Sequence, residues 1–188
     1  MSRYRKIDPR IWNDRKFSTL GDGGKLLFFM LLTHPSMTSL GAMRATPSGL
    51  AEEIGWEPKA FAEAFREVLS KGMAEHDQIA HLIALPNFIK YNPPENPNVL
   101  KAWAGAVDLL PECGLKEIVL QRARAFAEIK GEAFAKAFRE ALPEGVGTPL
   151  ANQEQEPEQE PGSQLSQEGT RLSVDRDGVV HELRRAAQ

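Results

Sequence analysis

The sequence predicts a mainly α-helical protein with a small β-hairpin, followed by a small helical unit and an acidic tail. Three observations predict this class. Apolar residues recur with helical spacing over residues 58–71 and 99–142, two short strand-like runs flank a polar turn at Asp77-Gln78, and large apolar side chains are almost absent from residues 143–170. The chain has 188 residues, which suits one domain or one domain with a smaller helical unit.

Residues 1–18 predict a basic arm with some apolar character. The first 25 residues hold seven basic and three acidic side chains. A basic arm of this kind can contact phosphates even though the net charge of the whole chain is −3. We expect the arm to pack on the core through four apolar side chains, namely Ile7, Ile11, Trp12 and Phe17.

A run of seven apolar residues, 26–32, predicts the first buried element. Leu, Met and Phe dominate this run and β-branched residues are missing, so we expect a helix over 24–33 rather than a strand. His34-Pro35 ends this helix. A loop with a short strand near 42–44 follows it.

Residues 46–72 predict two helices joined by a tight turn. Thr46 or Ser48 caps a short helix, which ends at Gly55 because glycine tolerates the left-handed conformation of a helix C-terminus. Pro58 fits the first turn of a longer helix, which stops at Gly72. The apolar residues of this longer helix recur at i, i+4, i+7 and i+8, which predicts one buried face: Phe61, Phe65, Val68 and Leu69.

Two short strands, Met73–His76 and Ile79–Ala84, are predicted around the polar turn. The order helix, strand, short helix, turn, longer helix and hairpin is typical of a winged helix-turn-helix, which we place at residues 1–91. The proline-rich residues 92–98 predict a linker.

The C-terminal half predicts a helical unit over 99–142 and a tail over 143–188. The unit contains helices near 99–110 and 115–129, and a third over 132–142 that either stands alone or continues the second after Gly131. The tail holds four basic and nine acidic residues, and we expect most of it to be disordered. Residues 171–187 regain some apolar side chains, typical of a short docking element.

Several classes are excluded by what the sequence lacks. The N-terminus has no signal-peptide core, and the longest apolar run is too short to span a membrane. Cys113 is the only cysteine, which fits a reducing cytoplasm. A phosphate-binding GxxxxGK[ST] loop is absent, and four scattered histidines with one cysteine do not form a zinc site. We therefore expect a cytoplasmic protein that is not an enzyme and that holds no cofactor or metal.

Candidate contacts to double-stranded DNA lie on the arm, the two central helices and the hairpin. They are Arg3, Arg5, Lys6, Arg44, Ser48, Lys59, Arg66, Lys71, Gln78 and Lys90. Their chemistry suits phosphates and base edges. The longer helix also carries Glu57, Glu63 and Glu67, however, and such a balanced helix is equally typical of an ordinary solvated face.

Two short sequence motifs resemble motifs of a known group of proteins. Ile7-Asp8-Pro9 with Trp12 opens the arm, and Leu85-Pro86-Asn87-Phe88 with Lys90 follows the hairpin. Over roughly residues 3–100 the chain resembles bacteriophage and prophage replication-initiation and replisome-organiser proteins, whose N-terminal domains are winged helices. The resemblance implies binding to an origin or operator and recruitment of a host replication protein. Residues 101–142 form too few helices for a full helicase-loading domain.

Three functions remain open from the sequence. The first is a phage-type DNA-binding protein that acts in replication initiation, in which residues 99–142 dimerise or hold the replication partner. The second is a transcriptional regulator of the same fold, which requires a homodimer on paired half-sites. The third is a protein-interaction module that binds a host protein rather than DNA, favoured by the balanced helix and the negative net charge.

Overall fold

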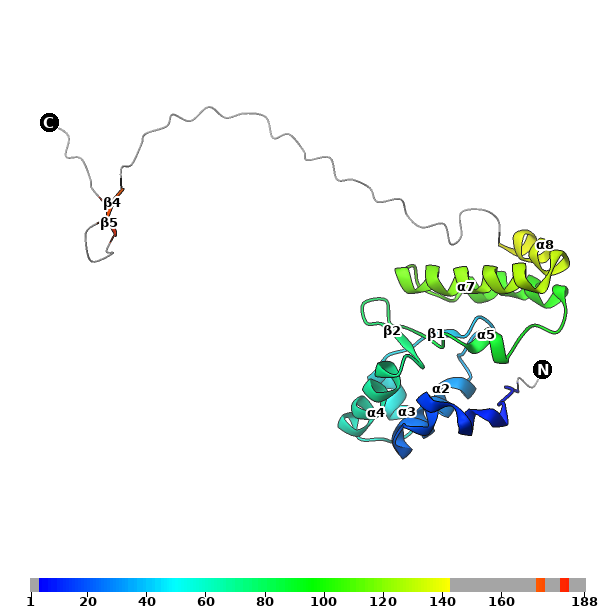
Figure 1. Ribbon diagram of the computed structural model, residues 1–188, viewed down its shortest axis with the longest axis horizontal. Helices are drawn as coiled ribbons and strands as arrows, with labels where there is room; N and C mark the ends of the chain where they lie inside the picture. Colours follow the sequence, from blue (N-terminus) through cyan, green and yellow to red (C-terminus); the bar gives the residue numbers. More distant parts are fainter. Residues whose placement is uncertain (1–3, 143–171, 175–179, 183–188) are drawn as a thin grey trace, which may run out of the picture. The chain divides into compact units, whose positions relative to one another are not determined.

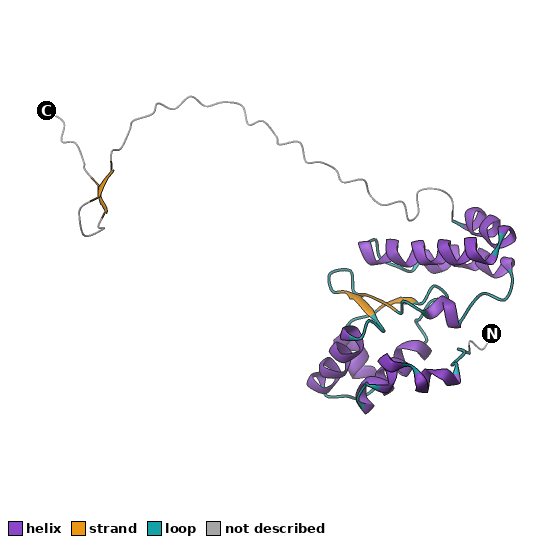
Figure 2. Ribbon diagram, in the orientation of Figure 1, coloured by secondary structure: helices purple, strands orange, loops and turns teal. Residues whose placement is uncertain are grey.

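The computed structural model describes residues 4–142, 172–174 and 180–182 (Figure 1). The chain divides into two compact units, Met1–Leu150 and Ala151–Gln188. The first unit is mainly helical and contains a three-stranded antiparallel sheet, as Figure 2 shows by colour.

The arm forms two short helical turns, η1 (Pro9–Asn13) and α1 (Arg15–Ser18). An aspartate caps each turn, because the Asp8 carboxylate accepts from the Arg10 N–H and the Asp14 carboxylate accepts from the N–H groups of the following turn. Phe17 is fully buried, as predicted. The predicted packing of the arm is otherwise only partial. Ile11 is half-buried, whereas Ile7 and Trp12 are 45% and 61% exposed, since η1 lies on the surface of the unit.

The next six elements build the sheet and the helices around it. They are α2 (Asp22–Thr33), β1 (Ala42–Arg44), α3 (Pro47–Glu53), α4 (Pro58–Ser70), β2 (Glu75–Asp77) and β3 (Leu82–Ala84). The strand order is β1-β3-β2, and Ile83 at the centre pairs with Met43 on one side and His76 on the other. Helices α2 and α3 both pack on α4.

The ends of α3 and α4 follow local sequence signals. Thr46, one of the two residues predicted to cap α3, accepts a hydrogen bond from the Gly49 N–H. Pro47 and Pro58 occupy first turns. Gly55 and Gly72 have φ of 65° and 61°, the left-handed conformation that ends a helix at low cost in glycine.

Three predicted elements have other bounds in the structure. The strands predicted over Met73–His76 and Ile79–Ala84 are β2 (Glu75–Asp77) and β3 (Leu82–Ala84), and the helix predicted over 99–110 is divided. Strand β2 includes Asp77, and the turn of the hairpin is 78–81, because the Asp77 side chain caps the turn instead of lying within it. The helix predicted over 99–110 consists of a 3-10 segment, η2 (Pro97–Ala102), and a short helix, α6 (Trp103–Asp108). A further short helix, α5 (Phe88–Tyr91), was not expected.

The remaining helices are α7 (Gly114–Lys130) and α8 (Glu132–Ala141). They are separate helices, since Gly131 lies between them with a φ of 113°. Helix α7 packs on β2 and β3, and α8 packs on η2 and α7. Trp103 and Leu100 belong to the same buried cluster as Leu27 and Ile83, so residues 99–142 share one core with residues 1–91. The division into two domains joined by a linker at 92–98 stays a prediction.

The second unit contains one described feature. Strands β4 (Leu172–Val174) and β5 (Val180–Glu182) pair antiparallel, with Ser173 opposite His181. They fall within the segment predicted to dock, 171–187. The remainder of the predicted disordered tail lies outside the described residues.

Candidate nucleic-acid interface

The outer face of α4 carries two of the predicted DNA contacts. Lys59, Glu63, Arg66 and Ser70 recur at i, i+4, i+7 and i+11, and all four are exposed. This stripe lies opposite the face that contributes the buried side chains of α4 to the core. Within the described part of the chain, neither Lys59 nor Arg66 forms an ion pair. Two unneutralised cations therefore flank one carboxylate on the most exposed line of the helix.

Glu67 does not belong to this solvated face, contrary to the sequence-based interpretation. Its carboxylate accepts a hydrogen bond of 2.9 Å from the Gly21 N–H at the start of α2. A carboxylate at a helix N-terminus satisfies an unpaired donor and complements the helix dipole. Glu67 therefore links α4 to the start of α2, because its carboxylate accepts a hydrogen bond there.

Arg44, Ser48 and Lys71 lie around the stripe without sharing its face. Arg44 is exposed at the end of β1, opposite Leu82 of β3 and next to the hairpin turn. Ser48 is exposed on the first turn of α3, where its hydroxyl lies 3.3 Å from Thr46 Oγ1. Lys71 follows α4 as its C-cap and is half-buried, which takes it off the exposed stripe.

The hairpin turn is held rigidly and exposes two side chains. Asp77 Oδ1 accepts hydrogen bonds from the N–H groups of Ala80 and Ile79, at 2.9 and 3.0 Å. These bonds, led by that of Ala80 and helped by the Cys113 thiol, hold the pKa of Asp77 below its usual value. Gln78 is exposed and Ile79 is 95% exposed at the tip. The predicted contact Gln78 is therefore accessible.

His76, in the same hairpin, faces the core. Its ring packs edge-on against Phe65 of α4, with 5.3 Å between ring centres. Its Nε2 is buried without a hydrogen-bond partner, and burial lowers the pKa of the imidazole. This histidine therefore supports the packing of β2 on α4 rather than a surface contact.

The basic arm is partly used to attach itself to the rest of the unit. The Arg5 guanidinium donates to the Met37 carbonyl oxygen at 2.5 Å and lies 5.1 Å from the centre of the Phe88 ring. The backbone N–H of Lys6 donates to the Asn92 side chain at 2.8 Å. Arg5 is thus an anchor of the arm, a role that the sequence did not indicate. Arg3 lies outside the described residues.

The ten predicted contacts do not form one surface. Lys59 and Arg66 on α4 lie on one side of the unit, whereas Lys90 on α5 and the start of the arm lie on another, as the positions of α4 and α5 in Figure 1 show. Lys90 Nζ lies 5.2 Å from the centre of the Tyr91 ring. Lys59 and Arg66 share one face of α4, and α3, which carries Ser48, packs on α4.

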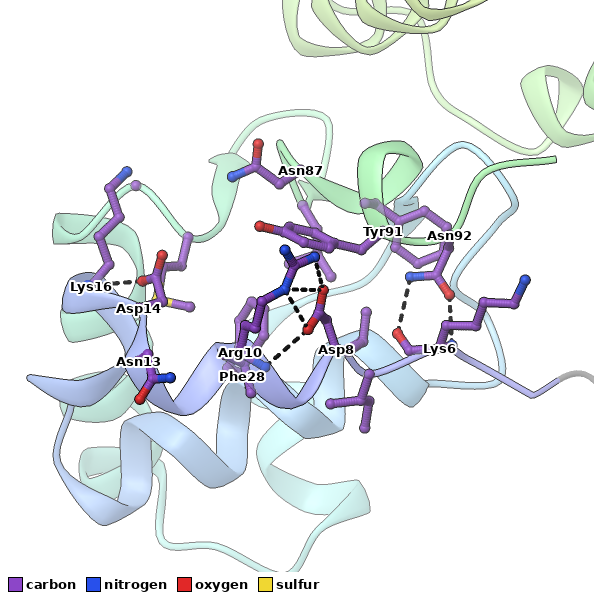
Figure 3. Close-up of a pocket in the computed structure, with 17 residues that line it drawn as sticks. Lys6, Asp8, Arg10, Asn13, Asp14, Lys16, Phe28, Asn87, Tyr91 and Asn92 are labelled. Carbon is purple, nitrogen blue, oxygen red and sulfur yellow. Dashed lines mark hydrogen bonds and ion pairs between the residues drawn. The ribbon is translucent and has the colours of Figure 1, made fainter. Parts of the chain in front are cut away.

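A pocket of about 390 Å³ lies between the arm, α2, α5 and the residues that follow α4 (Figure 3). Lys16, Asn87 and Tyr91 line it, and none of the three was among the sequence-based candidates. No spacing of these residues in the sequence signals a site, because two segments that lie far apart in the chain supply them.

In residues 4–142 and the two C-terminal strands, no three His, Cys, Asp or Glu side chains gather as metal ligands. None of the described helices combines the length and apolar character that a membrane crossing requires. The chain matches no family model, no curated protein and no solved structure.

Proposed function

We propose that this chain is a DNA-binding protein rather than an enzyme, and that its first 91 residues are a winged helix. The order α2, β1, α3, α4, β2 and β3, with β3 at the centre of the sheet, supports this fold. In such a fold α3 braces α4, and the β2–β3 hairpin is the wing.

The observation that carries the proposal is the outer face of α4. The major groove of B-DNA is about 12 Å wide and admits one α-helix. The stripe of Lys59 and Arg66 is exposed, and both cations lack an ion-pair partner among the described residues. Ala60 and Ala62 beside the stripe are small, so they permit close approach of the helix backbone to the groove. Arg44 at the end of β1 and Gln78 in the hairpin turn are also exposed.

The role in replication initiation rests on the resemblance of residues 3–100 alone. A transcriptional regulator of the same fold would use the same surface of α4. Replication requires a host replication partner, whereas regulation requires a homodimer on half-sites about 34 Å apart. Fragments of the surrounding genome distinguish the two roles, because the tightest-binding fragment contains either an origin or a promoter.

The proposal is tested by binding of the full chain to duplex DNA over a range of salt concentrations. We expect affinity to fall steeply with salt, since phosphate contacts release counterions. Lys59→Ala and Arg66→Ala should each weaken binding to the preferred fragment by about 1–3 kcal/mol where they contact bases. Lys101→Ala is the matched control, because Lys101 is exposed on η2 and has no ion pair among the described residues. Variants of α4 that bind as tightly as the parent chain would overturn the assignment of α4.

A second candidate function is that of a protein-docking module. Glu63 lies between Lys59 and Arg66 on the exposed stripe, and a carboxylate at the centre of this face opposes phosphate. The net charge of −3 favours the same alternative. If duplex DNA fails to bind even at low salt, while Lys59→Ala or Arg66→Ala weakens binding of a host replication protein, this second function replaces the first.

A further inference from the structure

The pocket shown in Figure 3 lies between segments that are distant in the sequence. Residues of η1 and α1 form one wall, and α5 with the residue before it forms the facing wall. Gly72 and Met73, which follow α4, close one end. The volume of about 390 Å³ is in the range of pockets that hold small organic molecules.

Apolar side chains form much of the lining. They come from the arm, from α2, from the segment after α4 and from the region of α5: Ile11, Phe28, Leu32, Met73, Leu85 and Phe88. Phe88 is buried and Met73 is half-buried against the core, so this part of the pocket is held in place by packing. An apolar group that enters the pocket leaves water at a gain of about 25 cal/mol per Å².

Two of the five charged side chains that line the pocket form an ion pair with each other. The Arg10 guanidinium makes a bidentate pair with the Asp8 carboxylate, and this pair lowers the pKa of Asp8 to about 2. The Asp14 carboxylate accepts two backbone N–H groups at the start of α1. Three basic and two acidic side chains line the pocket, which leaves a net charge of +1. Lys6 pairs at 3.9 Å with Glu95, which does not line the pocket, so Lys16 is the lining cation without an ion-pair partner among the described residues.

Three polar groups in the lining have no hydrogen-bond partner among the described residues: Lys16 Nζ, the Asn87 amide and the Tyr91 hydroxyl. Lys16 Nζ lies beside Gly72, 3.6 Å from where a Cβ on that glycine would be. Asn87 precedes α5 but makes no capping hydrogen bond with its side chain. In Figure 3 the Asn87 amide and the Tyr91 hydroxyl point toward the side of the pocket on which Lys16 lies. Each of the three groups can donate a hydrogen bond.

We propose that this pocket binds a small organic carboxylate with an apolar body, whose carboxylate is held by Lys16, Asn87 and Tyr91 while its body contacts the apolar lining. A lining with a net charge of +1, one cation without an ion-pair partner among the described residues, two neutral donors and apolar side chains favours a monoanion over a neutral or cationic molecule of the same shape. This binding site does not depend on the proposed DNA-binding function, because it lies away from the exposed stripe of α4.

Three compounds with the same phenylpropyl skeleton test the proposal: 3-phenylpropanoate, 3-phenylpropanamide and 3-phenylpropylamine. Each is titrated into the full-length, ¹⁵N-labelled protein, and chemical-shift changes are followed in two-dimensional NMR spectra. We expect the carboxylate to shift the signals of Lys16, Asn87 and Tyr91 and to bind about tenfold more tightly than the amide, the gain typical of a charge-assisted hydrogen bond. The amine should bind most weakly.

The Lys16→Gln variant removes the positive charge of this side chain and keeps a polar group of similar length, so it tests whether the charge determines the affinity for the carboxylate. This variant should bind the carboxylate about tenfold more weakly and the amide as tightly as the parent chain does. Arg15→Gln is the matched control, because Arg15 is the preceding residue of α1, is exposed and does not line the pocket. Equal affinity for all three compounds, shifts confined to other parts of the chain, or a carboxylate preference that survives in Lys16→Gln would each overturn the proposal.

Discussion

Arg122 of α7 forms a bidentate ion pair with Glu75 of β2, with N–O distances of 2.5 and 2.8 Å. The two side chains are about one third exposed, at 36% and 32%. This pair fastens the hairpin to the helix that covers it, so the proposed wing is braced from the C-terminal half of the unit. The hydrogen bonds to the Glu75 carboxylate favour the charged form of the guanidinium and raise the pKa of Arg122.

Removing either partner of this pair should loosen the attachment of the hairpin to α7. We expect a double-mutant cycle of Arg122→Ala and Glu75→Ala to show a coupling free energy of about 1 kcal/mol in urea unfolding, because the pair is bidentate and partly shielded from water. The matched control is Arg124–Glu128, an exposed i,i+4 pair with a distance of 3.0 Å, which should couple by only about 0.3–0.5 kcal/mol. Equal coupling free energies in the two cycles would show that the bidentate geometry of the Arg122–Glu75 pair adds no stability beyond that of an exposed ion pair.

Neighbouring glycines of α2 should respond differently to replacement by alanine. A Cβ on Gly23 meets Ala64 and Trp56 at 3.6 and 3.8 Å, which is ordinary contact, so Gly23→Ala should stabilise the fold by about 0.5–1 kcal/mol through helix propensity. A Cβ on Gly24 lies 2.5 Å from Glu67 Oε2 and 3.3 Å from the Leu20 side chain. Gly24→Ala forces Glu67 off the Gly21 N–H, a loss of about 1 kcal/mol that cancels the gain.

Thermal unfolding of the two glycine variants, measured side by side, checks this difference. If Gly24→Ala is as stable as Gly23→Ala, the contact between Glu67 and the start of α2 does not hold in solution.

Gly41 should tolerate no side chain at all. Its φ is 77°, and an added Cβ lies 2.2 Å from Phe88 Cβ, an atom held by the backbone of α5. We expect Gly41→Ala to destabilise the fold by roughly 2–5 kcal/mol, the sum of left-handed strain and overpacking. Gly55→Ala is the control for strain alone, because Gly55 has a φ of 65° and nothing within 4 Å of the added carbon; it should cost about 1–2 kcal/mol. Chemical denaturation measures both, and similar losses would contradict the close approach of Gly41 to Phe88.

His76 should make stability depend on pH. Burial lowers the pKa of this imidazole below its usual value of 6.5, so the unfolded chain binds its proton more readily than the folded chain does. The stability that neutral His76 contributes to the folded state is therefore complete above pH 6.5. It is lost as the pH falls from 6.5 through the lowered pKa of the folded state. Between about pH 7.5 and about pH 5, His76→Phe should lose less stability than the parent chain, as measured by urea unfolding. An unchanged pH dependence would show that His76 titrates equally in both states.

The first hundred residues were more predictable than the rest for a physical reason. Local backbone preferences set the helix ends in this part of the chain. Glycine tolerates the positive φ that ends a helix at Gly55 and Gly72, and the fixed φ of proline suits the first turn at Pro58. The segment 99–110 was wrongly predicted as one helix, because its periodicity does not show where a 3-10 segment gives way to an α-helix. The pairing of α7 with the hairpin was not predictable either, since no local pattern specifies which distant element a helix covers.

The sequence by itself determined the order of the elements from α2 to β3 and the exposed stripe of Lys59 and Arg66, because helical spacing and glycine positions act over a few residues. Only the tertiary structure decided which charged side chains are available. Three charged side chains form hydrogen bonds to partners that are distant in the sequence. The separations are 32 residues for Arg5, 46 for Glu67 and 47 for Arg122, so these side chains are engaged within the unit. The pocket that contains Lys16 likewise exists only because packing brings the arm, α2 and α5 together, and the apolar burial that drives this packing is non-directional and carries no local signature.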